Sequence, residues 1–305
     1  RVPLEEGAGR VLPQELYAAE NVPAFDRSPY DGYALRAADV KDASREAPVT
    51  LRVLEEIPAG SVPTQPVTAG TASRVMTGAP IPEGADTVIM FEKTEFTETS
   101  VTLFAPVRLG DNVIRAGEDI RAGTLLVSAG ERIDAALAGS LAAQGVTEPL
   151  VYKKPRIAVL STGTELVEAD ETPGAGKIRN SNAYTLIAAM RSLGCDTEYL
   201  GIVPDGTEGI AAAIAMGLST CDAVVSTGGV SAGDYDLTPD AIESLGAEVL
   251  VRGLAMKPGM ASALAVREGK LILSLSGNPA SSLTTYYGVV VPVLRKMAGL
   301  TDCVP

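Results

Sequence analysis

Residues 222–236 read DAVVSTGGVSAGDYD: a short apolar run, then a turn that contains three glycines, two aspartates and no lysine or arginine. An apolar run that ends in a glycine turn predicts a buried strand whose carboxyl end reaches a ligand. Glycine turns often cradle phosphates, whereas acidic side chains repel them. The stretch therefore predicts an α/β fold and a ligand that requires both glycine and carboxylate groups.

Two more segments end in the same way. RIAVLSTG (residues 156–163) and LILSLSG (residues 271–277) run from apolar residues into small polar residues and glycine. Further strand and helix patterns alternate with them: a strand at 196–203, helices at 180–194, 207–218 and 237–246, a hairpin bend at 267–270 and a closing helix at 278–300. This alternation predicts a doubly wound, mostly parallel sheet over residues 154–299. Because ligands bind at the carboxyl ends of such strands, the three turns should meet at one rim.

The first half of the chain has a different pattern. It is rich in Pro, Gly, Thr and Val, and it predicts strands at 49–57, 86–92 and 100–107 and one helix at 132–145. We expect a β-rich lobe of residues 24–118, inserted into a small mixed domain of residues 1–23 and 119–153. A hinge near residues 151–155 would lead into the α/β domain, and residues 300–305 would begin a linker.

Composition excludes several kinds of chemistry. The 305 residues include no histidine, which rules out a Ser-His-Asp triad, a histidine base and a histidine-ligated zinc. The three scattered cysteines suit reduced thiols of a cytoplasmic protein, and no apolar run reaches the roughly 18 residues of a membrane span. A net charge of −13 argues against a nucleic-acid partner. The chemistry that the composition still allows uses carboxylates, lysines, backbone amides and a hard cation such as Mg²⁺.

Each motif also has a structural interpretation. A glycine turn after a strand is often only a tight connection, and Glu165 and Asp236 can be solvated carboxylates in a first helical turn. Asp236 can cap the helix that begins near Thr238, and Lys257 can be a solvated residue before a Pro-Gly turn. Three glycine turns at one rim favour a shared ligand over chance.

Taken together, seven motifs resemble those of the molybdopterin molybdenumtransferases, the MoeA and gephyrin E-domain family, in order and spacing. They extend over nearly the whole chain: DRSPYDGYALR, RVMTGAPIPEGAD, IRAGEDI, LSTGTEL, STGGVSAGDYD, KPG and LSGNPASS. The resemblance implies an enzyme that inserts molybdate into adenylylated molybdopterin and releases AMP and molybdenum cofactor, with Mg²⁺ required. Glycine amides would then hold phosphates, and carboxylates would hold the cation that bridges acid to phosphate.

The resemblance also implies site residues. The catalytic candidates are Asp31, Asp119, Glu165, Asp205, Asp236 and Lys257, of which Glu165 and Asp236 would bind the metal. The substrate-binding candidates are Thr77, Ser161, Thr162, Gly163, Ser226, Gly228, Gly229, Ser231, Gly277, Asn278 and Pro279. We expect the amides of Gly228 and Gly229 to face the phosphates. Family sites lie between the α/β domain of one subunit and the β-rich domain of its partner, so a homodimer is implied.

The sequence also differs from the family. Met260 stands where many members carry a second lysine after the KPG motif. The family continues into a small β-barrel domain after the closing helix. Because the chain starts at Arg1 and stops near that point, we expect it to be a piece of a longer protein. Two alternative functions stay open: a non-catalytic molybdopterin-binding or scaffold module, and a molybdopterin adenylyltransferase.

Overall fold

The computed structural model describes residues 1–230 and 237–303 and divides the chain into two compact units. One unit comprises Arg1–Glu15, Ser128–Gly139 and Val146–Pro305, and the other comprises Leu16–Val127 and Ser140–Gly145. The three-domain division predicted above is finer than these units and stays a prediction.

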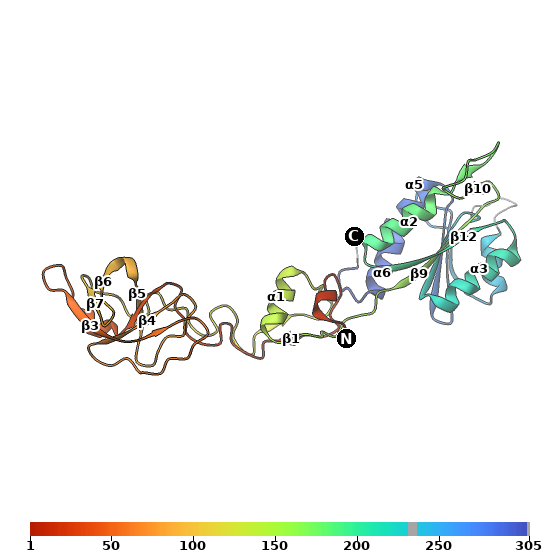
Figure 1. The fold of residues 1–305 in the computed structure, drawn as a ribbon. Helices are drawn as coiled ribbons and strands as arrows, with labels where there is room; N and C mark the ends of the chain where they lie inside the picture. Colours follow the sequence, from red (N-terminus) through yellow and green to blue (C-terminus); the bar gives the residue numbers. More distant parts are fainter. Residues whose placement is uncertain (231–236, 304–305) are drawn as a thin grey trace. The chain divides into compact units, whose positions relative to one another are not determined.

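A six-stranded sheet forms the centre of the first unit (Figure 1). Its strand order is β12-β9-β13-β16-β15-β14; the first four strands run parallel, β15 runs antiparallel to both of its neighbours, and β14 therefore has the direction of the first four. The strands are β9 (Arg156–Thr162), β12 (Asp196–Val203), β13 (Ala223–Thr227), β14 (Glu248–Arg252), β15 (Ser262–Arg267) and β16 (Lys270–Leu275). The predicted doubly wound, mostly parallel fold is confirmed, whereas the edge strand β14 was not predicted.

The hairpin between β15 and β16 shows why β15 runs in the opposite direction to the other strands. Arg267 pairs with Lys270 across a two-residue turn, and both turn residues, Glu268 (φ 52°) and Gly269 (φ 77°), have positive φ. Two positive φ angles define the turn type whose twist matches that of the flanking strands. The predicted bend at residues 267–270 is therefore confirmed.

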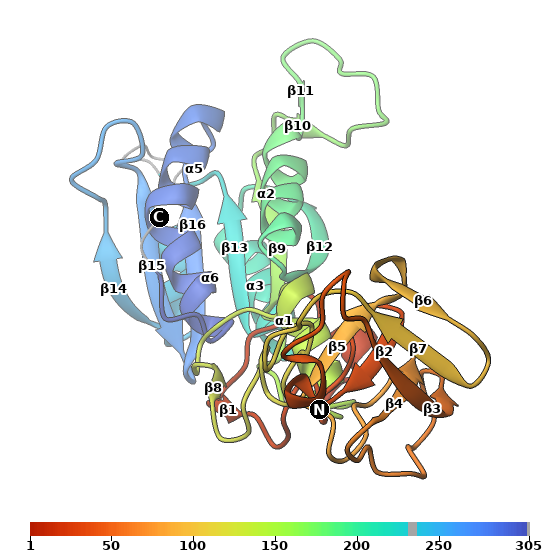
Figure 2. The ribbon, with the colours of Figure 1, turned by 90° about the vertical axis from the view of Figure 1, so that its left-hand side faces the viewer.

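Helices cover both faces of this sheet (Figure 2). In β9, Ile157 and Val159 pack in one cluster with α2, α6 and the segment Tyr286–Val290, while Ala158 and Leu160 pack in another with α3 and α4. This alternation follows from the two-residue period of a strand with both faces buried. The helices are α2 (Ser181–Ser192), α3 (Thr207–Thr220), α4 (Thr238–Ser244), α5 (Pro279–Thr285) and α6 (Val291–Met297). A π-helical segment, Tyr286–Val290, joins α5 to α6, so the predicted closing helix is not one regular helix.

Short elements complete the first unit. Leu4–Glu6 forms a 3-10 turn, and β10 (Leu166–Val167) pairs in parallel with β11 (Ile178–Arg179). Helix α1 (Ala135–Ala143) begins in the first unit and ends in the second; it lies within the helix predicted at 132–145, and Gly145 follows it with a φ of 71°. That φ suits the glycine that ends many helices.

The second unit has its own sheet and its own core. Its strand order is β5-β2-β4-β3-β7-β6, antiparallel except for the β3–β4 pair. The strands are β2 (Gly32–Leu35), β3 (Val49–Ile57), β4 (Thr71–Val75), β5 (Thr87–Met90), β6 (Thr94–Phe96) and β7 (Ser100–Leu103), with a separate pair β1 (Leu16–Tyr17) and β8 (Leu125–Val127). Two 3-10 turns, Ala37–Val40 and Phe91–Lys93, interrupt them. Tyr33, Leu35, Leu51 and Val101 are among the buried residues of its core.

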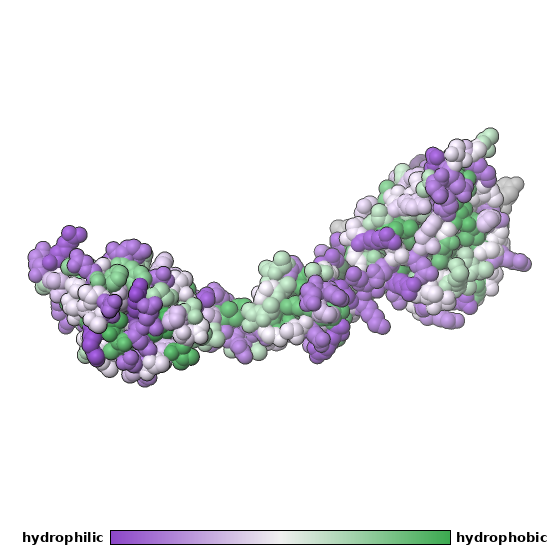
Figure 3. Space-filling model, in the orientation of Figure 1, coloured by the Kyte–Doolittle hydropathy of each residue, from purple (hydrophilic) through white to green (hydrophobic). Residues whose placement is uncertain are grey.

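The surfaces of both units mix polar and apolar residues, as the visible faces in Figure 3 show. Among the described residues, none of the helices combines the length and the apolar character needed to cross a bilayer.

Candidate functional site

The carboxyl ends of β9, β13 and β16 border a cavity of about 330 Å³ in the first unit. It contains eight predicted residues, so the prediction that the three turns meet at one rim is confirmed. The lining residues are Thr162, Gly163, Glu165, Asp205, Gly228, Gly229, Val230, Ser276, Gly277 and Asn278. A smaller adjoining cavity of about 70 Å³ shares Thr162, Glu165 and Gly277 with it and also contains Pro279.

Glycine is required at this rim because the turns touch each other through backbone atoms. A Cβ on Gly228 would lie 2.2 Å from the carbonyl oxygen of Thr162, and a Cβ on Gly229 would lie 2.6 Å from Oγ1 of Thr238. Both glycines also have positive φ, 96° and 63°. These residues therefore let the turns after β9 and β13 approach closely.

The two glycine amides differ in availability. The Gly228 amide donates a hydrogen bond to the carbonyl oxygen of Leu275, at 3.0 Å. The prediction that this amide faces a phosphate is therefore wrong, because the end of the neighbouring strand β16 already accepts its hydrogen bond. The amide of Gly229 has no hydrogen-bond partner among the described residues.

Glu165 folds back over the turn that precedes it. A Cβ on Gly163 would lie 2.4 Å from Oε2 of Glu165, and Gly163 has a φ of 148°. Only the missing side chain of Gly163 leaves room for the carboxylate in this position. The turn sequence STGTE thus places an acidic group at the cavity.

Asp205 supplies the second carboxylate of the cavity. Its Oδ2 accepts a hydrogen bond from the amide of Thr164, at 2.9 Å, which ties the turn after β12 to the turn after β9. Within residues 1–230 and 237–303, neither Glu165 nor Asp205 forms an ion pair with a lysine or arginine. The hydroxyl of Thr162 is buried at the same rim and has no partner in the described part of the chain. The rim therefore holds two uncompensated carboxylates and an unused hydroxyl group.

Two predicted serines lie beneath the rim. Ser161 and Ser226 are fully buried and line neither cavity. Ser161 donates to Oδ1 of Asn180 at 3.0 Å, and Ser226 donates to Oγ of Ser274 at 2.7 Å. Below the cavity, the first bond joins β9 to the start of α2, and the second joins β13 to β16.

Two asparagines that were not predicted help to build the site. The side chain of Asn180 caps α2 by accepting from the Ala183 amide, and its Nδ2 donates to the hydroxyl of Tyr199 at 2.8 Å. Nδ2 of Asn182 donates to the Gly277 carbonyl oxygen at 2.7 Å and so joins α2 to the turn after β16. The signal in the sequence was the run RNSN before the helix, which is typical of an N-cap.

Three predicted residues of the first unit lie elsewhere or cannot be placed. Lys257 follows β14 in an exposed turn, and it does not line the rim cavity. Ser231 and Asp236 lie outside the described residues.

The remaining predicted residues belong to the second unit. Oδ1 of Asp31 accepts hydrogen bonds from the amide of Thr77 at 2.7 Å and from its hydroxyl at 2.8 Å. These two bonds, the amide first, hold the pKa of Asp31 below its usual value because they favour the charged form. Asp119 is exposed, and its amide donates to the carbonyl oxygen of Val22.

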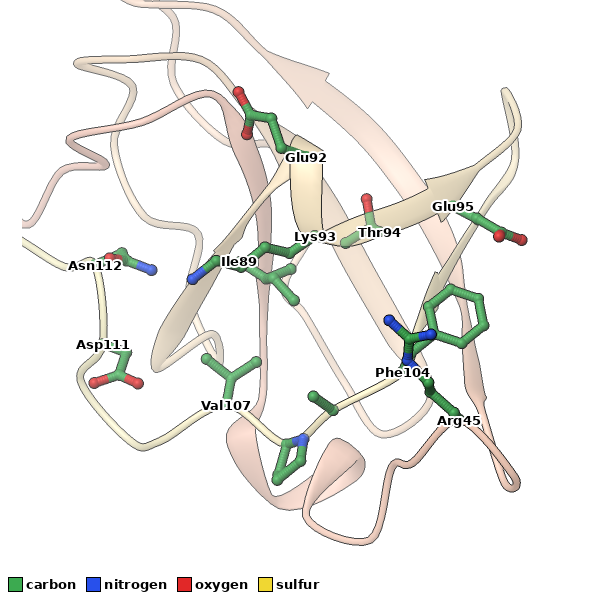
Figure 4. A pocket seen from close by; sticks show the side chains of 12 residues that line it. Arg45, Ile89, Glu92, Lys93, Thr94, Glu95, Phe104, Val107, Asp111 and Asn112 are labelled. Carbon is green, nitrogen blue, oxygen red and sulfur yellow. The ribbon is translucent and has the colours of Figure 1, made fainter.

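A larger cavity of about 760 Å³ lies in the second unit, beside Ile89 and the segment 104–107 (Figure 4). Its lining mixes both charges with apolar groups, since Lys93 and Arg45 line it together with Glu92, Glu95 and Asp111. It contains none of the predicted site residues. We therefore place the candidate site at the strand ends, where carboxylates and required glycines meet. No group of three or more His, Cys, Asp and Glu side chains arranged to hold a metal occurs in the described part of the chain.

Comparison with known proteins agrees with this architecture. Residues 1–145 match the model of the MoeA N-terminal region (domain I and II), and residues 158–296 match the model of a probable molybdopterin binding domain. The molybdopterin molybdenumtransferase of Staphylococcus epidermidis is 37% identical over 302 residues, which are 99% of this chain and 72% of that protein. The corresponding protein of Bacillus subtilis is 39% identical over 298 residues, 96% of this chain and 69% of that protein.

A solved structure is similar throughout. The crystal structure of the molybdopterin biosynthesis MoeA protein from Pyrococcus horikoshii matches with a TM-score of 0.87 and 37% identity, and the match covers 98% of this chain and 75% of that one. The chain therefore belongs to the molybdopterin molybdenumtransferase family.

Proposed function

We propose that this chain inserts molybdate into adenylylated molybdopterin and releases AMP and molybdenum cofactor in a Mg²⁺-dependent reaction. Its family is a family of transferases of molybdenum cofactor biosynthesis. The observation that carries the proposal is the strand-end cavity, in which Glu165 and Asp205 lie beside the glycine turns of β9 and β13. A loop that binds only a phosphate needs no carboxylates. A site that binds a phosphate together with a cation needs carboxylates to hold the cation.

The residues of the rim fit Mg²⁺. This ion prefers oxygen ligands and usually keeps several waters, so one or two carboxylates are enough to hold it. Glu165 has both oxygens without an ion-pair partner in the described residues, and Asp205 has one oxygen outside its bond to Thr164. We propose that these two groups, with Asp236, hold the cation. When bound, Mg²⁺ would offset the negative charge of the pyrophosphate.

The protein's own groups have separate tasks in this proposal. The Thr164 amide fixes Asp205, and the required glycine at position 163 fixes Glu165, so both carboxylates are oriented before substrate arrives. The amide of Gly229, which has no hydrogen-bond partner in the described part of the chain, would donate to a phosphate oxygen, and Lys257 would balance further phosphate charge. Ser231, Gly277, Asn278 and Pro279 would contact the rest of the substrate.

We propose that the second unit contributes to the same reaction from a partner subunit of a homodimer. Asp31, Thr77 and Asp119 would then act with the rim of the other chain. Thr77 keeps Asp31 ionised through two hydrogen bonds, as a group facing a cation or a donor should be. We also propose that the protein works in the cytoplasm.

The direct test is AMP release from adenylylated molybdopterin, measured with and without molybdate and with and without Mg²⁺. AMP should form only when both are present. Binding of the substrate with no AMP release under any condition would support a non-catalytic binding module instead. Formation of adenylylated molybdopterin from ATP and free molybdopterin would identify an adenylyltransferase.

A further inference from the structure

A second cavity of the first unit, about 210 Å³ in volume, lies at the end of the sheet opposite to the rim. Three chain segments line most of it: residues 8–11, Arg132 and residues 152–155. Residues 192–194, at the end of α2, and Ala298 close it. Because Pro155 directly precedes β9, the cavity faces the amino ends of the parallel strands.

Backbone hydrogen bonds fix the walls of this cavity. Val11 and Arg132 pair in an antiparallel bridge, and the Tyr152 amide donates to the Val11 carbonyl oxygen at 2.9 Å. The Arg10 guanidinium donates to the Tyr152 carbonyl oxygen at 2.6 Å. These bonds join the three segments to one another around the cavity.

The lining is cationic on a chain that is acidic overall. Arg10, Arg132, Lys153 and Lys154 line the cavity, and no aspartate or glutamate does, although the net charge of the chain is −13. Within the described residues, the ammonium groups of Lys153 and Lys154 form no ion pair or hydrogen bond. Four like charges around so small a volume repel one another, and an anion among them removes that repulsion.

Helix dipoles do not account for this charge. The carbonyl ends of α2 and α6 carry partial negative charge and attract cations. Basic residues in their own last turns, Arg191, Arg295 and Lys296, already occupy that role, and none of them lines the cavity. The four lining cations belong to other segments and surround an open space.

We propose that this cavity binds a small tetrahedral oxyanion, either a free inorganic anion or the phosphate group of a nucleotide. Guanidinium forks and ammonium groups are the side chains that recognise such oxygens. The site is separate from the strand-end rim and does not depend on the reaction proposed there. Inorganic phosphate, molybdate and AMP share the required chemistry and differ in size and charge.

The test is a calorimetric titration of the whole chain with each of these three probes at constant ionic strength. The variant Lys153→Gln/Lys154→Gln removes two cavity cations that lie on the surface, so folding should persist, as circular dichroism would verify. The control, Lys41→Gln/Arg267→Gln, removes the same charge from two side chains that do not line the cavity. Arg132→Gln gives a second, independent reduction of the cavity charge.

We expect at least one probe to bind, with an affinity that falls at least about tenfold in the cavity variant and less than about twofold in the control. Tighter binding of AMP than of phosphate would identify a nucleotide as the source, and the reverse order would identify a free anion. The proposal is overturned if no probe binds, or if the cavity variants and the control lose affinity equally. Equal loss would mean that only the overall charge matters.

Discussion

The carboxylate of Glu165 occupies the space that a side chain at position 163 would fill, since a Cβ on Gly163 would lie 2.4 Å from Oε2. The acidic group and the glycine turn of this rim are therefore parts of one arrangement.

This relationship predicts the effect of Gly163→Ala. The new methyl group displaces the flexible Glu165 side chain, and the φ of 148° adds backbone strain. We expect AMP release to fall at least about tenfold while the protein stays folded. Gly246→Ala is the control, because Gly246 also has positive φ but has open space around its Cβ position. Equal losses of activity in both variants would contradict a role for the Glu165 position.

Gly228→Ala should act on stability instead. Here the obstacle is the backbone carbonyl of Thr162 at 2.2 Å, which cannot rotate away as a side chain can. We expect the free energy of unfolding to fall by about 2–4 kcal/mol, measured by urea denaturation. Gly246→Ala should cost only about 1 kcal/mol. A loss in Gly228→Ala no larger than that of the control would show that the two turns separate easily.

Asp205→Asn tests the charge of the rim separately from its structure. Asparagine retains an oxygen that accepts from the Thr164 amide, so the melting temperature should change little, while the hard cation loses a carboxylate. AMP release should fall at least about tenfold, and part of it should return at high Mg²⁺. Asp222→Asn is the matched control, since Asp222 accepts from the Arg156 amide at 2.8 Å at the other end of the sheet. Full activity of Asp205→Asn at limiting Mg²⁺ would remove Asp205 from the proposed site.

The hydrogen bonds from Thr77 to Asp31 should make the stability of the protein depend on pH. Because its folded pKa lies below the ordinary 3.8, its contribution to stability is complete above that pH and is lost as the pH falls through the folded pKa. In Thr77→Val the hydroxyl bond is gone but the amide bond remains, so the pKa should rise part of the way towards 3.8. Carbon-13 NMR titration of the Asp31 carboxyl measures this directly. Thr50→Val, which removes a hydroxyl bonded to Thr102, should leave the pKa of Asp31 unchanged.

The proposed sharing of sites between subunits predicts complementation. Asp31→Asn and Glu165→Gln chains should each be inactive alone. When they are mixed, unfolded together and refolded, one site of each mixed dimer receives both native groups, so about one quarter of all sites should be active. If all of the catalytic groups came from one chain, the mixture would stay inactive. A monomeric mass by light scattering would also contradict the proposal.

The sequence by itself determined the α/β architecture and the location of the rim. Strands such as RIAVLST have apolar residues on both faces and are buried between two layers of helices. A continuous apolar run is visible in the local sequence, so this part of the fold could be predicted. The glycines at 163, 228 and 229 were also readable as turns. The motifs of the chain together identified the family, because seven weak signals in a fixed order are specific when combined.

Tertiary structure alone decided how each group at the rim is used. Whether the Gly228 amide is free depends on the carbonyl of Leu275, which lies on another strand of the sheet, and no local pattern records that bond. Burial of Ser161 and Ser226, the bond from Asn182 to Gly277, and the basic cavity between residues 8–11 and 152–155 depend equally on contacts between distant segments. These contacts could not be predicted from local sequence patterns, because they join residues that are far apart in the sequence and close together only in the folded protein.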